Sequence, residues 1–333
     1  MRIEEFLPDS NSKNTPSELT SPDEIPPTPL IETLTQNVDV HTPNEPPPSD
    51  EIADPPPIET IGESVGVHTP HERLVPGPNG ETTKVPPYIA FEHVSKSFGS
   101  LTVLDDVSFF VLPGETLCIL GRSGVGKSVS LQQIMGFLKP DAGQILVAGE
   151  NIAGYTEEQM QVVRKKVTMV FQNGALFDSL TVGENVAFPL RERGELIEDQ
   201  IGQIVNGLLE MVGVAGMAEL LPSDLSTGMK RSVAIARALS SQPEAILYDE
   251  PTTMVDPLMG RLLGDLIQKL KYQLKITSIV VTHDMRFAQK LADRVLFLHE
   301  AKAHFFGTMP EMEKSEDPII RQFLELDALV LPA

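Results

Sequence analysis

Eight residues with the chemistry to bind phosphate stand together at positions 121–128, in the order Gly-Arg-Ser-Gly-Val-Gly-Lys-Ser. Glycines allow a tight turn in which consecutive backbone N–H groups point at one anion, and Lys127 adds a positive charge. The hydroxyl of Ser128 is a ligand that Mg²⁺ accepts beside phosphate oxygens. The pattern therefore predicts a loop that binds the phosphates of a nucleotide together with Mg²⁺.

A second group of reactive side chains follows two short apolar runs further along the chain. Asp249 and Glu250 come directly after residues 245–248, and His283 comes shortly after residues 278–281. A strand that ends in Asp beside a phosphate loop is what Mg²⁺ chemistry requires. Structural ion pairing is the alternative role for the two acids, and their place at a strand end after a phosphate loop disfavours it.

These residues need strands that deliver them to the same end of a sheet. Ligands of open parallel sheets bind beyond the carboxyl ends of the strands, so the pattern predicts an α/β fold. Runs of strand length and composition lie at 116–120, 167–171, 245–248 and 278–281. A helix is predicted over 127–138, because one face would carry Leu131, Ile134, Met135 and Leu138.

The other periodic segments complete the predicted domain. Residues 89–94 and 108–111 are predicted to be antiparallel strands that lead into it, and residues 144–147 form another strand. From residue 176 to about residue 240 the pattern is helical. Its clearest apolar face, at spacings i, i+3, i+4, i+7 and i+8, consists of Ile201, Ile204, Val205, Leu208 and Leu209.

The first 87 residues have a different composition. They contain 18 of the 28 prolines, and 16 Asp and Glu against 4 Lys and Arg. Such a segment buries too little apolar surface to offset its chain entropy, so we predict a tail without secondary structure. Within it, a pattern that ends in Val-His-Thr-Pro at 40–43 recurs 27 residues later at 67–70. Two copies without periodicity indicate a duplicated linker or tether, since a solenoid needs three or more units.

Charge and composition limit the function classes. The chain carries a net charge of −21, of which −9 falls on residues 88–333, and no basic stripe is present, so nucleic-acid binding is not expected. The N-terminus lacks the apolar region of a signal peptide, and no run of about 18 apolar residues occurs, so a cytosolic protein is expected. Cys118, the single cysteine, is predicted to be a buried small hydrophobe and not a reactive thiol.

With these motifs in place, residues 88 to about 324 resemble the ATP-binding subunits of ABC transporters. The most diagnostic stretch is Leu-Ser-Thr-Gly-Met at 225–229, where that family carries Leu-Ser-Gly-Gly-Gln. The resemblance implies a P-loop NTPase with a RecA-like core, an antiparallel β subdomain and a helical subdomain over about 173–240. The predicted division is thus a tail at 1–87, the ATP-binding domain at 88–324 and a C-terminal tail at 325–333.

The resemblance also implies the roles of individual residues. Glu250 is implied as the general base, His283 as the switch histidine and Gln172 as the Q-loop glutamine. Two subunits are implied to meet head to tail with ATP between them. The implied Mg²⁺ site consists of Ser128, Gln172 and Asp249. The implied nucleotide contacts are Phe98, Gly121, Arg122, Ser123, Gly124, Val125, Gly126, Lys127, Ser128, Ser226, Gly228 and Asp256.

Two of these features have open alternatives at the level of the sequence. Phe98 is either a stacking platform for adenine or an ordinary core residue, and only the resemblance favours stacking. Lys230 and Arg231 follow Gly228 near the start of a predicted helix, where positive charge is unfavourable unless an anion lies nearby. A solvated helix face explains these two charges equally well.

The resemblance narrows toward the Mla/Mce-type (MlaF-like, toluene-tolerance) phospholipid-transport ATPases. It rests on residues 126–129, on residues 171–182 with 184–190, and on the signature that ends in Met229. It implies a dimer bound to multi-span permease subunits and to an Mce-type lipid-binding partner, at the cytoplasmic face of the inner membrane. The alternative is an amino-acid-type importer that shares generic helical-subdomain residues.

Residues 175–180 are the expected contact with the permease, because apolar side chains there lie next to the Q-loop glutamine. The alternative is that Leu176 and Phe177 are core residues.

Departures from the family pattern bear on rate and dimer affinity. Thr227 replaces the first glycine of the signature and adds a Cβ near the nucleotide, and Met254-Val255 replaces the usual Gly-Leu before Asp256. A competing class is a regulatory ABC-like protein that binds ATP without turnover. The presence of both Glu250 and His283 favours hydrolysis.

Overall fold

The computed structural model describes residues 73–76 and 82–330, and within them three sheets of six, four and two strands. The six-stranded sheet has the order β12-β11-β5-β10-β9-β8, in which β12 alone runs antiparallel to its neighbour. The carboxyl ends of β5, β8, β9 and β10 therefore meet at one end of the sheet, as predicted. The strands are β5 (Thr116–Leu120), β8 (Val167–Val170), β9 (Ala245–Asp249), β10 (Thr277–Val281), β11 (Arg294–His299) and β12 (Lys302–Gly307).

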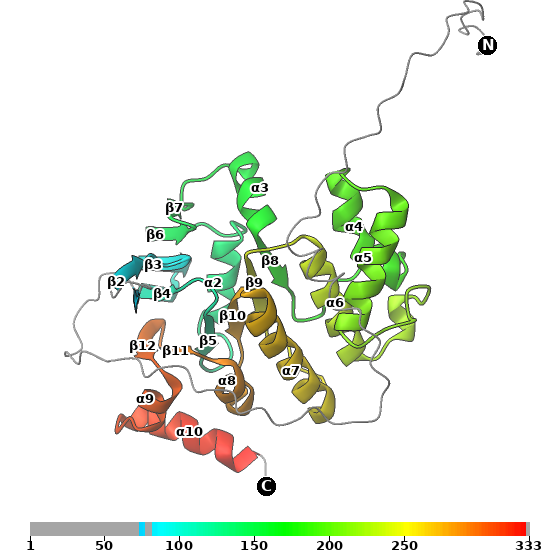
Figure 1. Ribbon diagram of the computed structural model, residues 1–333. Helices are drawn as coiled ribbons and strands as arrows, with labels where there is room; N and C mark the ends of the chain where they lie inside the picture. Colours follow the sequence, from blue (N-terminus) through cyan, green and yellow to red (C-terminus); the bar gives the residue numbers. More distant parts are fainter. Residues whose placement is uncertain (1–72, 77–81, 331–333) are drawn as a thin grey trace, which may run out of the picture.

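The four-stranded sheet is antiparallel throughout, in the order β4-β3-β6-β7. The predicted antiparallel pair is confirmed, and the rings of Phe91 and Phe109 stack across it with centroids 4.4 Å apart. Figure 1 shows helix α2 (Lys127–Ile134) between this sheet and the six-stranded sheet. The strands are β3 (Ile89–Phe98), β4 (Leu101–Val111), β6 (Ala142–Val147) and β7 (Glu150–Asn151).

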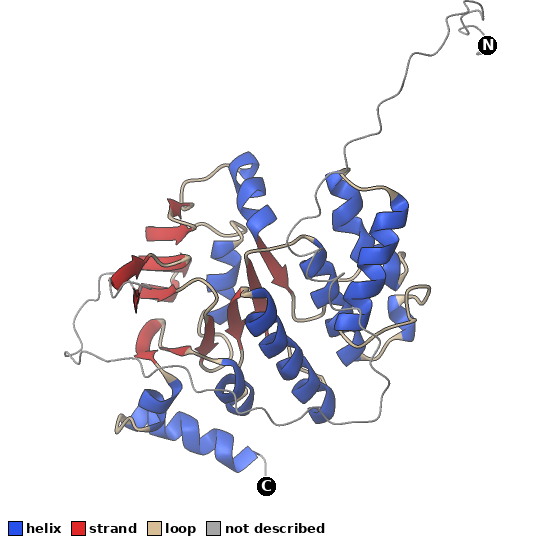
Figure 2. Cartoon of the chain, viewed as in Figure 1, coloured by secondary structure: helices blue, strands red, loops and turns tan. Residues whose placement is uncertain are grey.

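Three helices form a layer at the other side of the molecule, at the right in Figure 1 and in blue in Figure 2. They are α4 (Val182–Arg193), α5 (Glu198–Met211) and α6 (Thr227–Ser240), and the segments 171–181 and 212–226 flank them. All five residues of the predicted apolar face of α5 are buried. We call residues 171–240 the helical layer.

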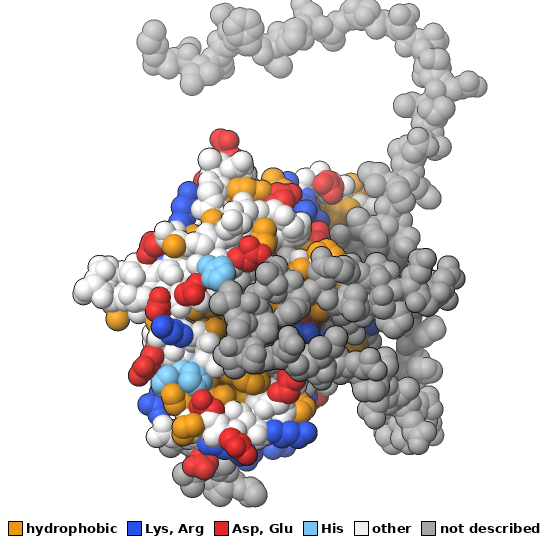
Figure 3. Space-filling model, turned by 90° about the vertical axis from the view of Figure 1, so that its left-hand side faces the viewer, with side chains coloured by type: hydrophobic (Ala, Val, Ile, Leu, Met, Phe, Trp, Pro, Cys, Tyr) orange, Lys and Arg blue, Asp and Glu red, His pale blue; other side chains and the backbone are white. Residues whose placement is uncertain are grey.

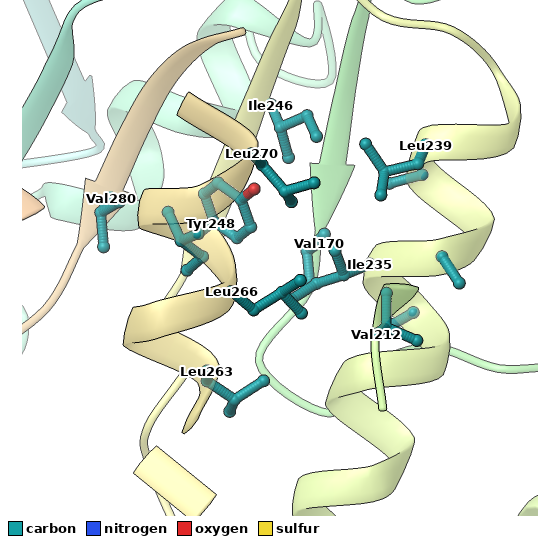
Figure 4. Packing of buried hydrophobic residues seen from close by; sticks show 14 of the residues in the cluster. Val170, Val212, Ile235, Leu239, Ile246, Tyr248, Leu263, Leu266, Leu270 and Val280 are labelled. Atoms are coloured by element: carbon teal, nitrogen blue, oxygen red, sulfur yellow. The ribbon is translucent and has the colours of Figure 1, made fainter. Parts of the chain in front are cut away.

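The core that joins this layer to the sheet consists of apolar side chains from both (Figure 4). This cluster contains Tyr248 of β9, Val170 of β8, Ile235 of α6 and Leu266 of α7 (Pro257–Leu274). Cys118 belongs to the same cluster and is fully buried, as predicted; burial raises the pKa of its thiol. The signature helix α6 thereby shares one core with the strand that ends in Asp249.

Helix α2 is shorter than predicted, because it ends at Ile134 and not at Leu138. Two residues later Gly136 adopts a left-handed φ of 70°, and a Cβ on it would lie 2.7 Å from Cε of Met160. Met160 belongs to α3 (Glu157–Lys166), so the packing of α3 against this turn fixes the end of α2.

The predicted tails are wrong at both of their inner boundaries. Residues 73–85 contain an antiparallel pair, β1 (Arg73–Pro76) with β2 (Thr82–Val85), where no secondary structure was expected. The β-branched residues of this stretch, and Asn79-Gly80 between the two runs, are strand and turn signals that proline content obscured. The 27-residue repeat lies outside the described residues. At the other end, α10 (Pro318–Val330) crosses the boundary at residue 324, and its Phe323 ring lies 4.8 Å from the ring of Phe297 in β11.

The remaining elements are short. They are η1 (Pro222–Asp224), α8 (Met285–Leu291) and α9 (Met309–Glu313). None of the helices in the described ranges is long and apolar enough to cross a membrane. On the face that carries the four-stranded sheet, acidic and basic side chains are interspersed (Figure 3).

Candidate active site

The loop between β5 and α2 has the backbone that the glycine pattern predicts. Gly121 and Gly126 both have positive φ values, 148° and 101°. A Cβ on Gly121 would lie 2.5 Å from the carbonyl oxygen of Leu298, and one on Gly126 would lie 2.7 Å from that of Val103. Only glycine fits at these two positions. Between them Arg122, Ser123 and Gly124 are exposed and Val125 is half-buried, so the loop is open to a ligand.

Lys127 is buried at the start of α2 and its amine lies inside this loop. Its Nζ donates hydrogen bonds to the carbonyl oxygens of Gly121 at 2.8 Å and Arg122 at 3.2 Å. The same nitrogen lies 3.4 Å from Oε1 of Glu250. The amine is therefore fixed between the phosphate loop and the strand that carries the acids.

Ser128 and Asp249 come together from two elements that are far apart in the sequence. The Ser128 hydroxyl donates a hydrogen bond of 2.8 Å to Oδ1 of Asp249. Burial is the main cause that raises the pKa of Asp249, and the charge of Glu250 adds to it, whereas the Ser128 hydrogen bond and Lys127 act against it. A cation beside this carboxylate would stabilise its charged form.

The donor set of this pair fits Mg²⁺, which binds hydroxyl and carboxylate oxygens and completes its shell with water and phosphate oxygens. In the part of the chain that the structure describes, no group of three or more His, Cys, Asp or Glu side chains could hold a metal ion. A cation at Ser128 and Asp249 would therefore take its other ligands from water, the nucleotide or a neutral side chain.

Glu250 is held in one position by its backbone and by two neighbours. Its φ of 47° is unusual for a residue with a side chain, and its N–H donates to the carbonyl oxygen of Val281 at 2.9 Å. Its Oε2 lies 2.7 Å from Nδ1 of His283 and accepts a hydrogen bond of 3.3 Å from the Thr253 hydroxyl. Thr253 was not predicted from the sequence, because no motif distinguishes it from its neighbours.

Gln172 and Phe98 lie at the periphery of this group. Gln172 lies two residues after the end of β8, is exposed, and makes no side-chain hydrogen bond within the described ranges. Phe98 is 46% exposed, so it is not a core residue. It lies opposite Leu101 on the neighbouring strand, and Leu101 lines a cleft of about 480 Å³ together with Gly124 and Val125 of the phosphate loop. The strand end that carries Phe98 therefore lies near the cleft beside the phosphate loop.

The signature residues do not join this group in a single chain. Ser226 caps α6 by accepting a hydrogen bond from the Met229 N–H at 3.3 Å, and Asp256 caps α7 by accepting one from the Met259 N–H at 3.0 Å. Gly228 is buried, and a Cβ there would lie 2.9 Å from Cβ of Met259. Among the described residues, no hydrogen bond or ion pair connects Ser226, Gly228 or Asp256 to the Lys127–Glu250–His283 group.

The sequence left two questions open on the helical layer: whether Lys230 and Arg231 lie on a solvated helix face, and whether Leu176 and Phe177 are core residues. Arg231 is only 4% exposed, so a solvated helix face is wrong for it, whereas Lys230 is half-buried. Leu176 is half-buried and packs against the core, so the core assignment holds for it. Phe177 is 43% exposed and its ring lies 5.0 Å from that of Phe188, which is also exposed, so Phe177 is not a core residue.

Comparison with known proteins indicates the same family as the sequence motifs. A protein-family model described as "ABC transporter" matches residues 104–253. The Intermembrane phospholipid transport system ATP-binding protein MlaF of Escherichia coli strain K12 is 39% identical over 232 residues, which are 70% of this chain and 86% of that protein. Protein TRIGALACTOSYLDIACYLGLYCEROL 3, chloroplastic, of Arabidopsis thaliana is 40% identical over 246 residues, 69% of this chain and 71% of that protein.

A solved structure matches in fold as well as in sequence. The dimeric post-hydrolysis state of the ATP-binding cassette MJ0796, bound to ADP and Pi, superimposes with a TM-score of 0.62 and 30% identity. The match covers 66% of this chain and 98% of that one. It therefore spans almost the whole of a cassette that is known to form a dimer and to hold nucleotide.

Proposed function

The chain belongs to the ABC transporter family of ATP-binding proteins, and we propose that this ABC ATPase is the subunit that drives phospholipid transport through a membrane permease. The observation that supports the cargo is the similarity to the bacterial phospholipid-transport ATP-binding protein, which extends over most of that protein. The plant relative, whose name refers to a galactolipid, supports a lipid cargo independently.

In the proposed reaction ATP binds with its phosphates in the loop 121–128. The loop N–H groups and Lys127 bind the phosphate oxygens, and the amine exchanges its contact with Glu250 for them. Mg²⁺ would be held by Ser128 and Asp249, with Gln172 as a further ligand, and would neutralise charge on the phosphates. Phe98 stacks on the adenine.

Glu250 is the proposed general base, which accepts a proton from the attacking water. His283 and Thr253 fix the carboxylate through the two hydrogen bonds to Oε2, so its orientation is set before ATP binds. His283 is mostly exposed, and its imidazole is therefore free to contact the γ-phosphate as well as Glu250. A general base of this kind contributes roughly 100- to 10,000-fold to a rate.

The complete site is proposed to need a second copy of the chain. Ser226 and Gly228 lie at the N-terminus of α6, where N–H groups and the helix dipole favour an anion. We assign them to the γ-phosphate bound by the partner copy, with Asp256 at the same junction. This explains why no contact joins them to Lys127 in one chain.

The proposed permease contact is the exposed pair Phe177 and Phe188 on the helical layer, beside Gln172. Two permease subunits, an Mce-type lipid-binding partner and a position at the cytoplasmic face of the inner membrane complete the proposed assembly. Residues 1–72 are proposed to be dispensable for catalysis, because the site is made of residues 98–283.

The assembly is tested by purifying the full chain from its native membranes in mild detergent and identifying the bound subunits. We expect a multi-span permease and a lipid-binding subunit at two ATPase chains per complex. After reconstitution, phospholipid vesicles should stimulate ATP hydrolysis. Recovery of an amino-acid permease, with hydrolysis stimulated by an amino acid and not by phospholipid, would contradict the lipid assignment.

A further inference from the structure

Arg231 is a buried cation that the proposed mechanism does not use. It lies in α6, two residues after the signature, and is 4% exposed. Its Nε is fully buried without a hydrogen-bond partner, and across the described ranges its guanidinium forms no ion pair. Burial alone lowers its pKa, since no charged neighbour contributes. A buried charge without a partner is costly, so a group that supplies an acceptor would stabilise the fold.

The chain segment that covers this guanidinium begins at Gln172. We call residues 172–177 the Gln172 segment. At Gly174, which is buried with a φ of 78°, a Cβ would lie 3.6 Å from Nη1 of Arg231 and 3.7 Å from Cβ of Ala234. The segment therefore crosses α6 directly over Arg231.

Beyond this crossing the segment is firmly attached to the helical layer. Arg237 donates hydrogen bonds to the carbonyl oxygens of Gly174 at 3.2 Å and Ala175 at 2.8 Å. The side chain of Asn185 in α4 accepts a hydrogen bond from the Phe177 N–H at 2.8 Å and donates one to the Phe177 carbonyl oxygen at 3.1 Å. These contacts leave residues 174–177 little freedom to move relative to α6.

The part that carries the functional side chain is not attached in this way. Within the described residues, the carbonyl oxygens of Gln172 and Asn173 accept no hydrogen bond. Two unpaired acceptors thus lie within two residues of Gly174, whose Cβ position is 3.6 Å from Nη1 of Arg231. Guanidinium donors and carbonyl oxygens pair readily, and the fork of Arg can serve two acceptors at once.

We propose that Arg231 is a positioning residue for Gln172: in the ATP-bound dimer its guanidinium donates hydrogen bonds to the carbonyl oxygens of Gln172 and Asn173. This inference rests on the proposed role of Gln172 at Mg²⁺. Because α6 begins at the signature, engagement of Ser226 and Gly228 by the partner's ATP would then set Gln172 through the same helix. The position of Gln172 at the site would then depend on whether the second copy has bound.

A double-mutant cycle tests this on the full chain in its membrane complex. Arg231→Met keeps the hydrocarbon but removes every donor, and Gln172→Ala removes the positioned side chain. We expect each variant to lower kcat by about tenfold while KM for ATP changes by less than about twofold. The double variant should be no slower than the slower single variant, because both changes remove one interaction. Arg231→Lys, which retains a donor, should recover part of the activity.

Arg321→Met, at an exposed position of α10, serves as the matched control and should equal the parent. Losses that multiply in the double variant would overturn the inference, as would an Arg231→Met chain with the activity of the parent. A loss that appears only when the permease is bound would also overturn it, since Arg231 would then serve the permease contact. If Arg231→Met does not fold, the cycle is run with Arg231→Lys.

The proposed function fails separately from this inference. If Gln172→Ala alone has no effect, the assignment of Gln172 is wrong and the positioning role is wrong with it. If Gln172→Ala is slow but combines multiplicatively with Arg231→Met, the role of Gln172 stands and the inference about Arg231 is wrong.

Discussion

The carboxyl end of the six-stranded sheet and the helical layer hold their functional side chains in different ways. At the sheet, Lys127 and His283 both contact Glu250, and Ser128 contacts Asp249. On the helical layer, by contrast, Gln172 and Phe177 are exposed, and the guanidinium of Arg231 is buried without a partner in the described ranges. We call these five side chains, Lys127, Ser128, Asp249, Glu250 and His283, the chemical group. The chemical group is thus assembled within one chain, whereas these side chains of the helical layer have no partner or are exposed.

This difference has a physical basis in the elements that carry the residues. The chemical group extends from strands such as β5 and β10, which are buried at every residue and pair with neighbours on both sides. Groups on rigid, buried elements keep their geometry without a ligand. The helical layer joins the sheet through side-chain packing and the Gln172 segment, so its position relative to the sheet can respond to binding. The variants that follow change the chemical group, the helical layer or the segment that precedes both.

The largest effect is expected from Lys127→Ala, which removes the buried amine between the phosphate loop and Glu250. Affinity for ATP should fall by at least about 100-fold, because charge-assisted contacts to phosphate are lost. Titration with a fluorescent ATP analogue measures it. Lys139→Ala, at an exposed position beyond α2, is the control and should bind as the parent does. Equal affinity in both variants would show that the loop does not bind phosphate through Lys127.

A smaller and more selective effect is expected from Phe177→Asp on the helical layer. A carboxylate on this exposed apolar surface should weaken permease binding by about tenfold or more, because the charge would be desolvated in the interface. ATP hydrolysis by the chain without permease should stay within about twofold of the parent. Co-purification and an ATPase assay measure the two effects. Val162→Asp, at an exposed apolar position of α3, is the matched control.

Retained permease binding in Phe177→Asp would place the contact elsewhere on the helical layer. Loss of hydrolysis in the isolated chain would contradict the comparison itself, because a change on the helical layer would then have disturbed the chemical group.

A modest gain is expected from Thr227→Gly in the signature. Thr227 is exposed in the first turn of α6, where its side chain would stand between the helix N-terminus and the partner's ATP. Removing it should raise the ATPase rate or tighten the ATP-dependent dimer by about threefold, a difference below 1 kcal/mol. A rate and a dimer affinity equal to those of the parent would show that the substitution is silent.

The smallest effect is expected from deletion of residues 1–72. The truncated chain retains β1, β2 and every residue of the candidate site. Its ATPase rate should change by less than about twofold, since no element of the site is removed. Loss of folding or turnover would assign these residues a role in the catalytic unit.

The sequence predicted the chemical group more completely than the helical layer. The phosphate loop, its strand Thr116–Leu120 and the two acids at the end of β9 were predicted by residue, because local patterns specify them. The hydrogen bond from Thr253 to Glu250 was not predicted, because it depends on the left-handed backbone at Glu250. Local spacing carries no information on that turn.

Contacts between distant segments explain the remaining differences. Helix α2 ends early because Met160 of another helix packs on Gly136. The environment of Arg231 depends on the Gln172 segment, which lies more than 50 residues earlier in the chain. The place of Arg231 near the start of α6 therefore could not show whether its side chain is solvated or buried. The pair β1–β2 was not predicted because residues 1–87 were treated as one segment on the basis of their proline-rich composition.

The most direct test of the central claim, that Glu250 is the base of a preassembled group, is the ATPase rate of Glu250→Gln with its ATP-dependent dimerisation. The amide retains the shape of the side chain but does not accept the proton of water. We predict a rate at least about 100-fold below the parent, with ATP still bound and a stable dimer detected by sedimentation in ATP and Mg²⁺. Hydrolysis at the rate of the parent would contradict the assignment of Glu250.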